Sequence, residues 1–250
     1  HLGLGLLSLQ QARAAASIIA LSGGTLISGD RLVDLDADRL EILRKVCPSY
    51  GVAARPIDLF EADRPEIFEL PIKTEFGEWL VVALFNYSGE GAPKSVSLKQ
   101  LRLPKGKKCV AFEFWSQQLI GEFEKELKVR VEPQSVALLS VHPVAGVPHV
   151  ISTDRHFSQG AIELKGMAWD GASNTLRGTS TGAEGTAYNV SVYVPGTYRW
   201  ASEKPDYFQD FGEFSVGKIA SSLLRVRCRF DAGTETGWHI QFDANTGQQA

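Results

Sequence analysis

The segment that decides the fold is Ala20-Leu21-Ser22-Gly23-Gly24-Thr25-Leu26-Ile27-Ser28-Gly29-Asp30-Arg31-Leu32, followed by Asp38-Arg39-Leu40-Glu41-Ile42-Leu43-Arg44-Lys45-Val46-Cys47-Pro48. The pattern predicts the end of a helix, a short buried strand at Thr25-Leu26-Ile27, a glycine turn and a second helix that Pro48 ends. Beyond Pro48 no helical pattern recurs. Helix and buried strand followed by strands alone is the order expected where a (β/α)8 barrel ends and an all-β appendage begins.

Both helices have the patterns that packing requires. Residues 6–21 are rich in Leu and Ala at three- and four-residue intervals, which predicts a helix buried on most of its circumference. In the second helix Leu40, Leu43 and Val46 form an apolar stripe. Asp34 and Asp36 are both candidate N-caps for it, because a short acidic side chain accepts hydrogen bonds from the first turn.

The rest of the chain alternates with a period of two and predicts a mainly β fold. The predicted strands cover residues 78–87, 96–98, 108–115, 127–131 and 135–141, and after a linker at 142–148 residues 161–164, 176–179, 188–194, 223–230 and 238–242. We therefore expect C-terminal β-sandwich domains preceded by a short α/β remnant of a (β/α)8 barrel. The expected division is residues 1–47 for the remnant, 48–147 for an antiparallel sandwich and 148–250 for a second β-rich domain.

Composition excludes several classes of protein. The 250 residues carry a net charge of -3 with dispersed Lys and Arg, so nucleic acid is not an expected partner. Three widely spaced cysteines form neither a metal motif nor a disulfide framework, which favours a reducing, cytoplasmic compartment. The start, His1 to Leu7, lacks a basic region and a long apolar run, so we expect neither a signal peptide nor a membrane partner. No cofactor is expected, and His1 is not expected to be the native N-terminus.

The opening segments resemble the end of the catalytic barrel in the α-galactosidase (melibiase) superfamily, glycoside hydrolase families 27 and 36. The matching residues are, in order, Leu21-Ser22-Gly23-Gly24, Ser28-Gly29-Asp30-Arg31-Leu32 and Arg39-Leu40-Glu41-Ile42-Leu43. The segment Ser152-Thr153-Asp154-Arg155-His156-Phe157-Ser158-Gln159-Gly160-Ala161 is similar to one in C-terminal β domains of family 36. The resemblance covers about residues 1–165, and the ordered set of motifs carries it.

This resemblance implies retaining hydrolysis of a terminal α-linked galactose or a similar sugar, which needs two carboxyl groups about 5–5.5 Å apart. In the family both are aspartates at the C-terminal ends of the fourth and sixth barrel strands. On this comparison the chain starts after the seventh strand, so we expect no catalytic residue in it and no activity from it alone. His1 would follow that strand, where the family lines its sugar pocket, and is the substrate-binding candidate. Carbohydrate is then the partner of the intact enzyme.

Other polar residues have two interpretations each. Asp30 is either a carboxylate that lines the pocket or braces a loop, or a turn residue, and we favour the turn. Asp154-Arg155-His156 is expected to brace a domain junction. The histidines lack Glu or Cys partners at ligand spacing, so no metal site is expected. Asn86 and Asn189 match the N-glycosylation pattern, which also arises by chance.

The aromatic residues of the last block support a second hypothesis. If these rings are exposed, they would bind sugar by stacking. If they are buried, they belong to the core, and this is the interpretation that we favour. The residues concerned are Trp169, Trp200, Trp238, Tyr198 and Tyr207, whereas Trp79 and Trp115 are expected in the core. The chain could thus be a carbohydrate-binding module, or a structural and oligomerisation module that forms a homo-oligomer through an exposed barrel-remnant face. Without the preceding barrel strands, the first helix is expected to dock on the sandwich, to dock on a second copy, or to be partly disordered.

Overall fold

The computed structural model describes residues 2–61, 63–103, 106–202 and 208–245. The chain forms two compact units, and each is described by itself. Unit 1 comprises His1–Ile72, Glu78–Pro143 and His156–Gln159, and unit 2 comprises Lys73–Gly77, Val144–Arg155 and Gly160–Ala250. The fold is mainly β, as predicted. The predicted domain boundaries near residues 47 and 147 stay predictions.

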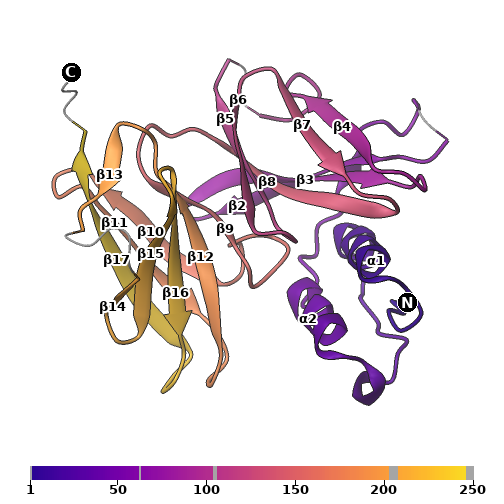
Figure 1. Ribbon diagram of the computed structural model, residues 1–250, viewed down its shortest axis with the longest axis horizontal. Coiled ribbons are helices and arrows are strands. Elements are labelled where there is room, and N and C mark those ends of the chain that lie inside the picture. Colours follow the sequence, from indigo (N-terminus) through magenta and orange to yellow (C-terminus); the bar gives the residue numbers. More distant parts are fainter. Residues whose placement is uncertain (1, 62, 104–105, 203–207, 246–250) are drawn as a thin grey trace. The chain divides into compact units, whose positions relative to one another are not determined.

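The helical part of unit 1 begins with α1 (Leu9–Leu21), which Ser8 caps through a reciprocal pair of hydrogen bonds with Gln11. A short 3₁₀ turn, η1 (Leu32–Asp34), precedes α2 (Ala37–Val46). Of the two candidate N-caps, Asp36 takes the position, and its carboxylate accepts the backbone N–H of Arg39 at 2.8 Å. The helices α1 and α2 lie side by side (Figure 1).

The strands of unit 1 form a six-stranded sheet in the order β1-β2-β3-β8-β5-β6 and a two-stranded sheet, β4-β7. Their bounds are β1 Arg55–Pro56, β2 Ile67–Thr74, β3 Gly77–Asn86, β4 Ala92–Ser97, β5 Cys109–Glu113, β6 Gln118–Phe123, β7 Glu126–Val131 and β8 Ser135–Pro143. One core cluster joins both sheets, and it includes Val82 of β3 and Leu139 of β8 together with Val96 and Leu127 of the smaller sheet. Because α1 also packs on β8, the central strands are buried on both faces, which explains the continuous apolar run 80–85.

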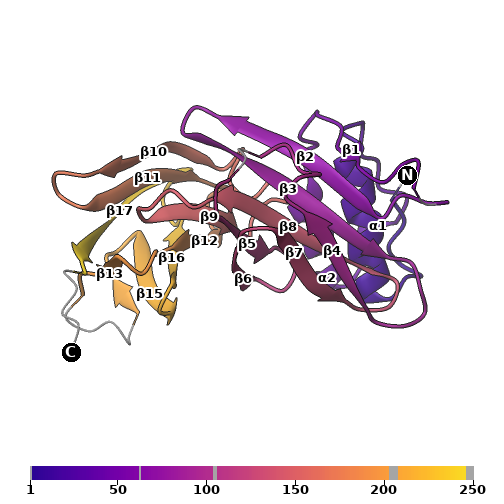
Figure 2. The same cartoon turned by 90° about the horizontal axis from the view of Figure 1, so that it is seen from above.

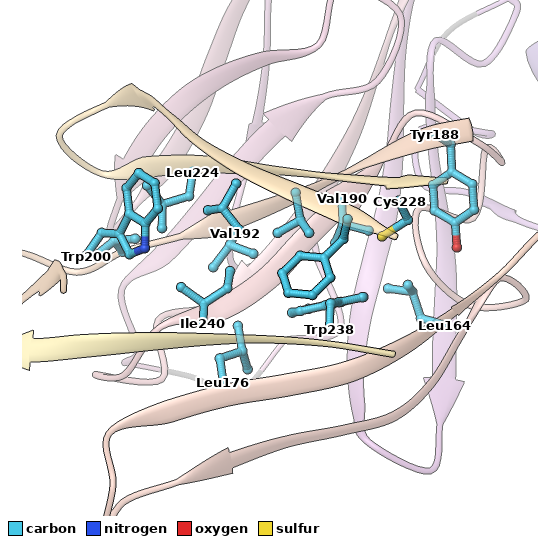
Figure 3. Packing of buried hydrophobic residues seen from close by; sticks show 14 of the residues in the cluster. Leu164, Leu176, Tyr188, Val190, Val192, Trp200, Leu224, Cys228, Trp238 and Ile240 are labelled. Atoms are coloured by element: carbon cyan, nitrogen blue, oxygen red, sulfur yellow. The ribbon is translucent and has the colours of Figure 1, made fainter. Parts of the chain in front are cut away.

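Unit 2 is a sandwich of two antiparallel sheets, β10-β11-β17-β13 and β14-β15-β16-β12-β9 (Figure 2). The bounds are β9 His149–Thr153, β10 Leu164–Asp170, β11 Thr175–Thr181, β12 Ala187–Tyr193, β13 Tyr198–Trp200, β14 Gln209–Asp210, β15 Phe214–Ala220, β16 Leu223–Arg229 and β17 Glu235–Ala244. Alternate residues of facing strands, among them Val190, Val226, Trp238 and Ile240, fill one apolar core (Figure 3).

Some sequence predictions of strands are wrong. Thr25-Leu26-Ile27 is not a buried strand: it lies next to one bridge residue, Ser28, and the side chain of Ile27 is half exposed. A parallel strand is buried only where strands and helices cover it, and the described residues supply a single pairing partner. The predicted strand 161–164 begins only at Leu164, because residues 161–163 form a turn.

Candidate functional site

In the N-terminal segment two short extended stretches, one before and one after α1, are joined by a single β-bridge. Leu2 pairs with Ser28 in parallel, since the N–H of Leu2 donates to the carbonyl of Ile27 at 2.8 Å and the N–H of Gly29 donates to the carbonyl of Leu2 at 2.9 Å. The helix α1 lies between the two in sequence. In unit 1 the pairs β1–β2, β3–β8, β5–β8, β5–β6 and β4–β7 are antiparallel, and so are the strand pairs of both unit 2 sheets. A parallel pair needs a long crossover, and α1 provides it.

Asp30 follows this bridge and holds the loop that leads into α1. Its carboxylate accepts the backbone N–H of Leu4 at 2.6 Å and that of Gly5 at 3.3 Å. The side chain of Arg39 donates to the carbonyls of Leu4 and Leu7, which fastens the same loop to α2. Asp30 therefore braces a loop, which is one of its two interpretations, and it does so in place of the favoured role as a turn residue. Asp34, the other candidate cap, pairs with Arg31 on the surface.

Apolar side chains are exposed around this segment. Leu6 and Val33 are 103% and 83% exposed, and Ile27 and Leu32 are about half exposed. In contrast, Leu2 and Leu4 are buried in unit 1. Exposed large apolar residues gathered in one segment indicate a surface that a partner covers.

Of the three outcomes considered for the first helix, the structure has it docked on the sheets of unit 1. The indole N–H of Trp115 donates to the Ser17 hydroxyl at 3.0 Å, and the Arg13 guanidinium lies 5.6 Å from the Trp115 ring centroid. Ala12 and Ala16 are fully buried. The prediction that Trp115 belongs to the core is therefore wrong in detail, since the residue is half-buried after β5 and contacts α1.

The substrate-binding candidate His1 lies outside the described residues. The residues of the Asp154-Arg155-His156 segment have separate roles. Asp154 accepts the backbone and side-chain N–H groups of Asn189, at 2.7 and 2.6 Å, in unit 2. His156 contacts the Ser158 hydroxyl at 2.7 Å and the Pro48 carbonyl at 2.8 Å in unit 1. These contacts fix loops, and the bracing of a domain junction stays a prediction.

A buried carboxyl that the sequence did not single out, Glu163, lies next to this segment. The Thr153 hydroxyl donates to it, and burial raises the pKa of the Glu163 carboxyl, against the smaller opposing effect of that hydrogen bond. The Glu163 carbonyl accepts the Tyr188 hydroxyl at 2.9 Å. A turn residue before a strand gives no sequence signal for such burial, because its partners Thr181 of β11 and Tyr188 of β12 lie later in the chain. All its hydrogen-bond partners among the described residues belong to unit 2, and they fit a structural role.

The glycosylation pattern at Asn86 does not describe an accessible acceptor. Asn86 is buried at the end of β3, and its amide donates to the carbonyls of Glu90, Val131 and Glu132 at 2.8 to 3.0 Å. It therefore ties the β3 end to the end of β7. Asn189 is likewise occupied by Asp154.

The aromatic residues of the last block are core for the most part, as favoured. Trp238 and Trp200 are buried in the unit 2 core, and Trp169 and Tyr198 pack against it half-buried. Tyr207 lies outside the described residues. Trp79 is buried and stacks on His142, with ring centroids 5.3 Å apart.

The described ranges contain neither a metal site nor a membrane-spanning helix. No group of three or more His, Cys, Asp or Glu side chains there is arranged to hold a metal ion. No helix in the same residues has the length and apolar content needed to cross a membrane. Burial raises the pKa of the Cys109 and Cys228 thiols to about 11, so both are unreactive at neutral pH.

Comparison with known proteins gives structural likeness only. No family model matches the chain, and no curated protein matches its sequence. A GH27 β-L-arabinopyranosidase from Geobacillus stearothermophilus is 21% identical with a TM-score of 0.46, over 56% of this chain and 32% of that one. The α-galactosidase I of Mortierella vinacea is 17% identical with a TM-score of 0.47, over 57% and 39%. An α-galactosidase from Saccharomyces cerevisiae, solved with raffinose, is 17% identical with a TM-score of 0.45, over 56% and 46%.

The part of this chain that aligns spans less than half the length of each of these enzymes. The likeness does not transfer the activity of these enzymes to this chain.

Proposed function

We propose that this chain is the C-terminal part of a retaining glycoside hydrolase of the α-galactosidase superfamily, acting on α-galactosides or similar sugars. In this proposal residues 1–47 are the last helix–strand–helix segment of a (β/α)8 barrel, and the catalytic aspartate pair precedes residue 1. The ordered motifs that resemble families 27 and 36 support it.

One observation carries the proposal: the parallel bridge between Leu2 and Ser28, with α1 between them and α2 after them. A (β/α)8 barrel repeats this unit, with parallel neighbouring strands each followed by a helix. The exposed Leu6, Ile27 and Val33 support the same interpretation, because barrel strands and helices would cover such side chains.

The proposal gives Asp30 a defined role. Barrel active sites lie at the C-terminal ends of the strands, and Asp30 directly follows the proposed eighth strand. Its carboxylate is engaged by two backbone N–H groups of the loop at Leu4 and Gly5. Asp30 therefore holds the loop that follows Leu2 in the proposed seventh strand, and His1 stays the proposed substrate contact. Asp30 does not act as nucleophile or acid.

The test is the coding sequence upstream of the His1 codon in the source genome. The proposal predicts an in-frame extension with six strand–helix units and the beginning of the seventh strand, with an aspartate after the fourth and the sixth strands. Replacing either aspartate by asparagine in the extended protein should abolish hydrolysis of an α-galactoside. An upstream sequence that encodes a different fold, or a stop codon in frame directly before His1, would refute the proposal.

A further inference from the structure

Unit 2 contains a cavity of about 490 Å³ between the ends of its two sheets. One sheet contributes Lys218 and Leu224, with Val194 directly after β12, and the other contributes the β13 residues Tyr198 to Trp200 and, from β17, Asp243. Cavities of a few hundred Å³ with an apolar floor and a few polar groups are the usual form of small-molecule sites. None of the preceding roles uses this cavity.

The floor of the cavity is the open end of the hydrophobic core. Val194, Leu224 and Trp200 are all members of the core cluster, and Trp200 is 9% exposed. Figure 3 shows Leu224 and Trp200 at one end of this cluster. The indole N–H of Trp200 makes no hydrogen bond to any described residue. An indole ring with an unused donor at the edge of a cavity suits a ligand that has both an apolar face and hydroxyl groups.

The wall carries a positive charge at its exposed rim. Lys218 pairs across the strands with Leu224, and Val216, two residues before it, lies in the core. Because side chains alternate along a strand, Lys218 is on the inner face of its sheet. It has no ion pair in the part of the chain that the structure describes. The other charges of the cavity neutralise each other, since Arg199 pairs with Asp243 at 3.0 Å.

We propose that this cavity binds an acidic pyranose sugar, a hexuronic acid residue such as galacturonate. The indole N–H of Trp200 donates to one ring hydroxyl, the carboxylate binds the Lys218 ammonium, and Ser221 and the Arg199–Asp243 pair bind further hydroxyls. The unmatched charge of Lys218 selects the carboxylate over a neutral sugar. This site does not depend on the proposed glycosidase ancestry, because the argument for that ancestry uses none of the residues that line the cavity.

The test is a titration of the full 250-residue chain, labelled with ¹⁵N, followed by the indole N–H signal of Trp200. The Trp200→Phe variant assigns that signal. Sodium galacturonate, methyl α-galactoside and sodium acetate are compared at equal concentrations and ionic strength. We expect saturable shifts with galacturonate and roughly tenfold weaker binding of methyl α-galactoside, from the loss of one charge-assisted hydrogen bond.

Lys218→Gln should weaken galacturonate binding roughly tenfold and remove the preference over methyl α-galactoside. Lys165→Gln is the matched control, because Lys165 is an exposed lysine of the same unit, paired with Glu235 at 3.0 Å, and does not line the cavity. It should bind like the native chain. Absence of saturable binding, equal shifts with acetate, or equal losses in both lysine variants would overturn the proposal.

Discussion

Removal of the Asp30 carboxylate tests the loop that begins the proposed barrel segment. In Asp30→Ala the N–H of Leu4, which donates to Asp30 at 2.6 Å in a partly buried position, loses a charged acceptor. Hydrogen bonds to charged groups contribute about 1.5–3 kcal/mol. The contact with Gly5 is exposed and 3.3 Å long, so it adds little. We therefore expect Asp30→Ala to lower the free energy of unfolding of unit 1 by about 2 kcal/mol.

Urea denaturation at neutral pH measures the global effect, and amide hydrogen exchange measures the local one. The amides of Leu2, Leu4 and Gly29 should exchange faster in Asp30→Ala, because Leu2 and Gly29 form the parallel bridge that the loop supports. Asp34→Ala is the matched control. Its exposed pair with Arg31 is 3.3 Å long, so the change should stay within about 0.5 kcal/mol. Equal stability of both variants, with unchanged exchange at Leu2 and Gly29, would show that Asp30 does not hold the loop.

Three further predictions concern groups fixed by the fold. Burial raises the pKa of Glu163, so the folded protein keeps a proton that the unfolded chain releases, and the native chain loses stability as pH rises above the ordinary glutamate pKa. Glu163→Gln removes this titration, so the variant should become more stable than the native chain as pH rises. Urea denaturation at acidic and alkaline pH measures the difference. Similar pH dependence in both proteins would refute this. Asp36→Ala should lower the midpoint of thermal denaturation through loss of the α2 N-cap, and rescue by Asp36→Ser would separate capping from charge. Asn86→Ala should cost about 3 kcal/mol by leaving buried carbonyls unpaired, and a loss below about 0.5 kcal/mol would contradict that account.

The sequence predicts those elements whose capping residues, apolar pattern and end signals all lie within the element itself and agree with its packing in the fold. The α2 helix has its cap at Asp36, its apolar stripe and its stop at Pro48, and each signal lies within a few residues of the others. The strand β3 is predicted equally well, since its apolar run is long and flanked by polar residues. In such segments no distant residue is needed to define the element.

Other elements depend on partners that lie far away in the sequence. The strand expected at Thr25-Leu26-Ile27 needs neighbours on both sides, and among the described residues Leu2 alone pairs beside it. Short edge strands such as β13 and β14 form only because β17 and β15 pair with them, so two or three residues carry no pattern of their own. The same holds for the proposed sugar site. Lys218 lies on an inner sheet face through its register with Leu224, and neither residue indicates this alone.

The proposed function places this polypeptide in a sugar-cleaving enzyme whose reacting carboxylates lie upstream of it. The most direct measurement is the release of p-nitrophenol from p-nitrophenyl α-galactopyranoside by the purified 250-residue chain and by the extended gene product under the same conditions. We expect turnover by the extended protein and only the background rate with the chain alone. Saturable turnover by the chain alone, or none by the extended protein, would contradict the proposed function.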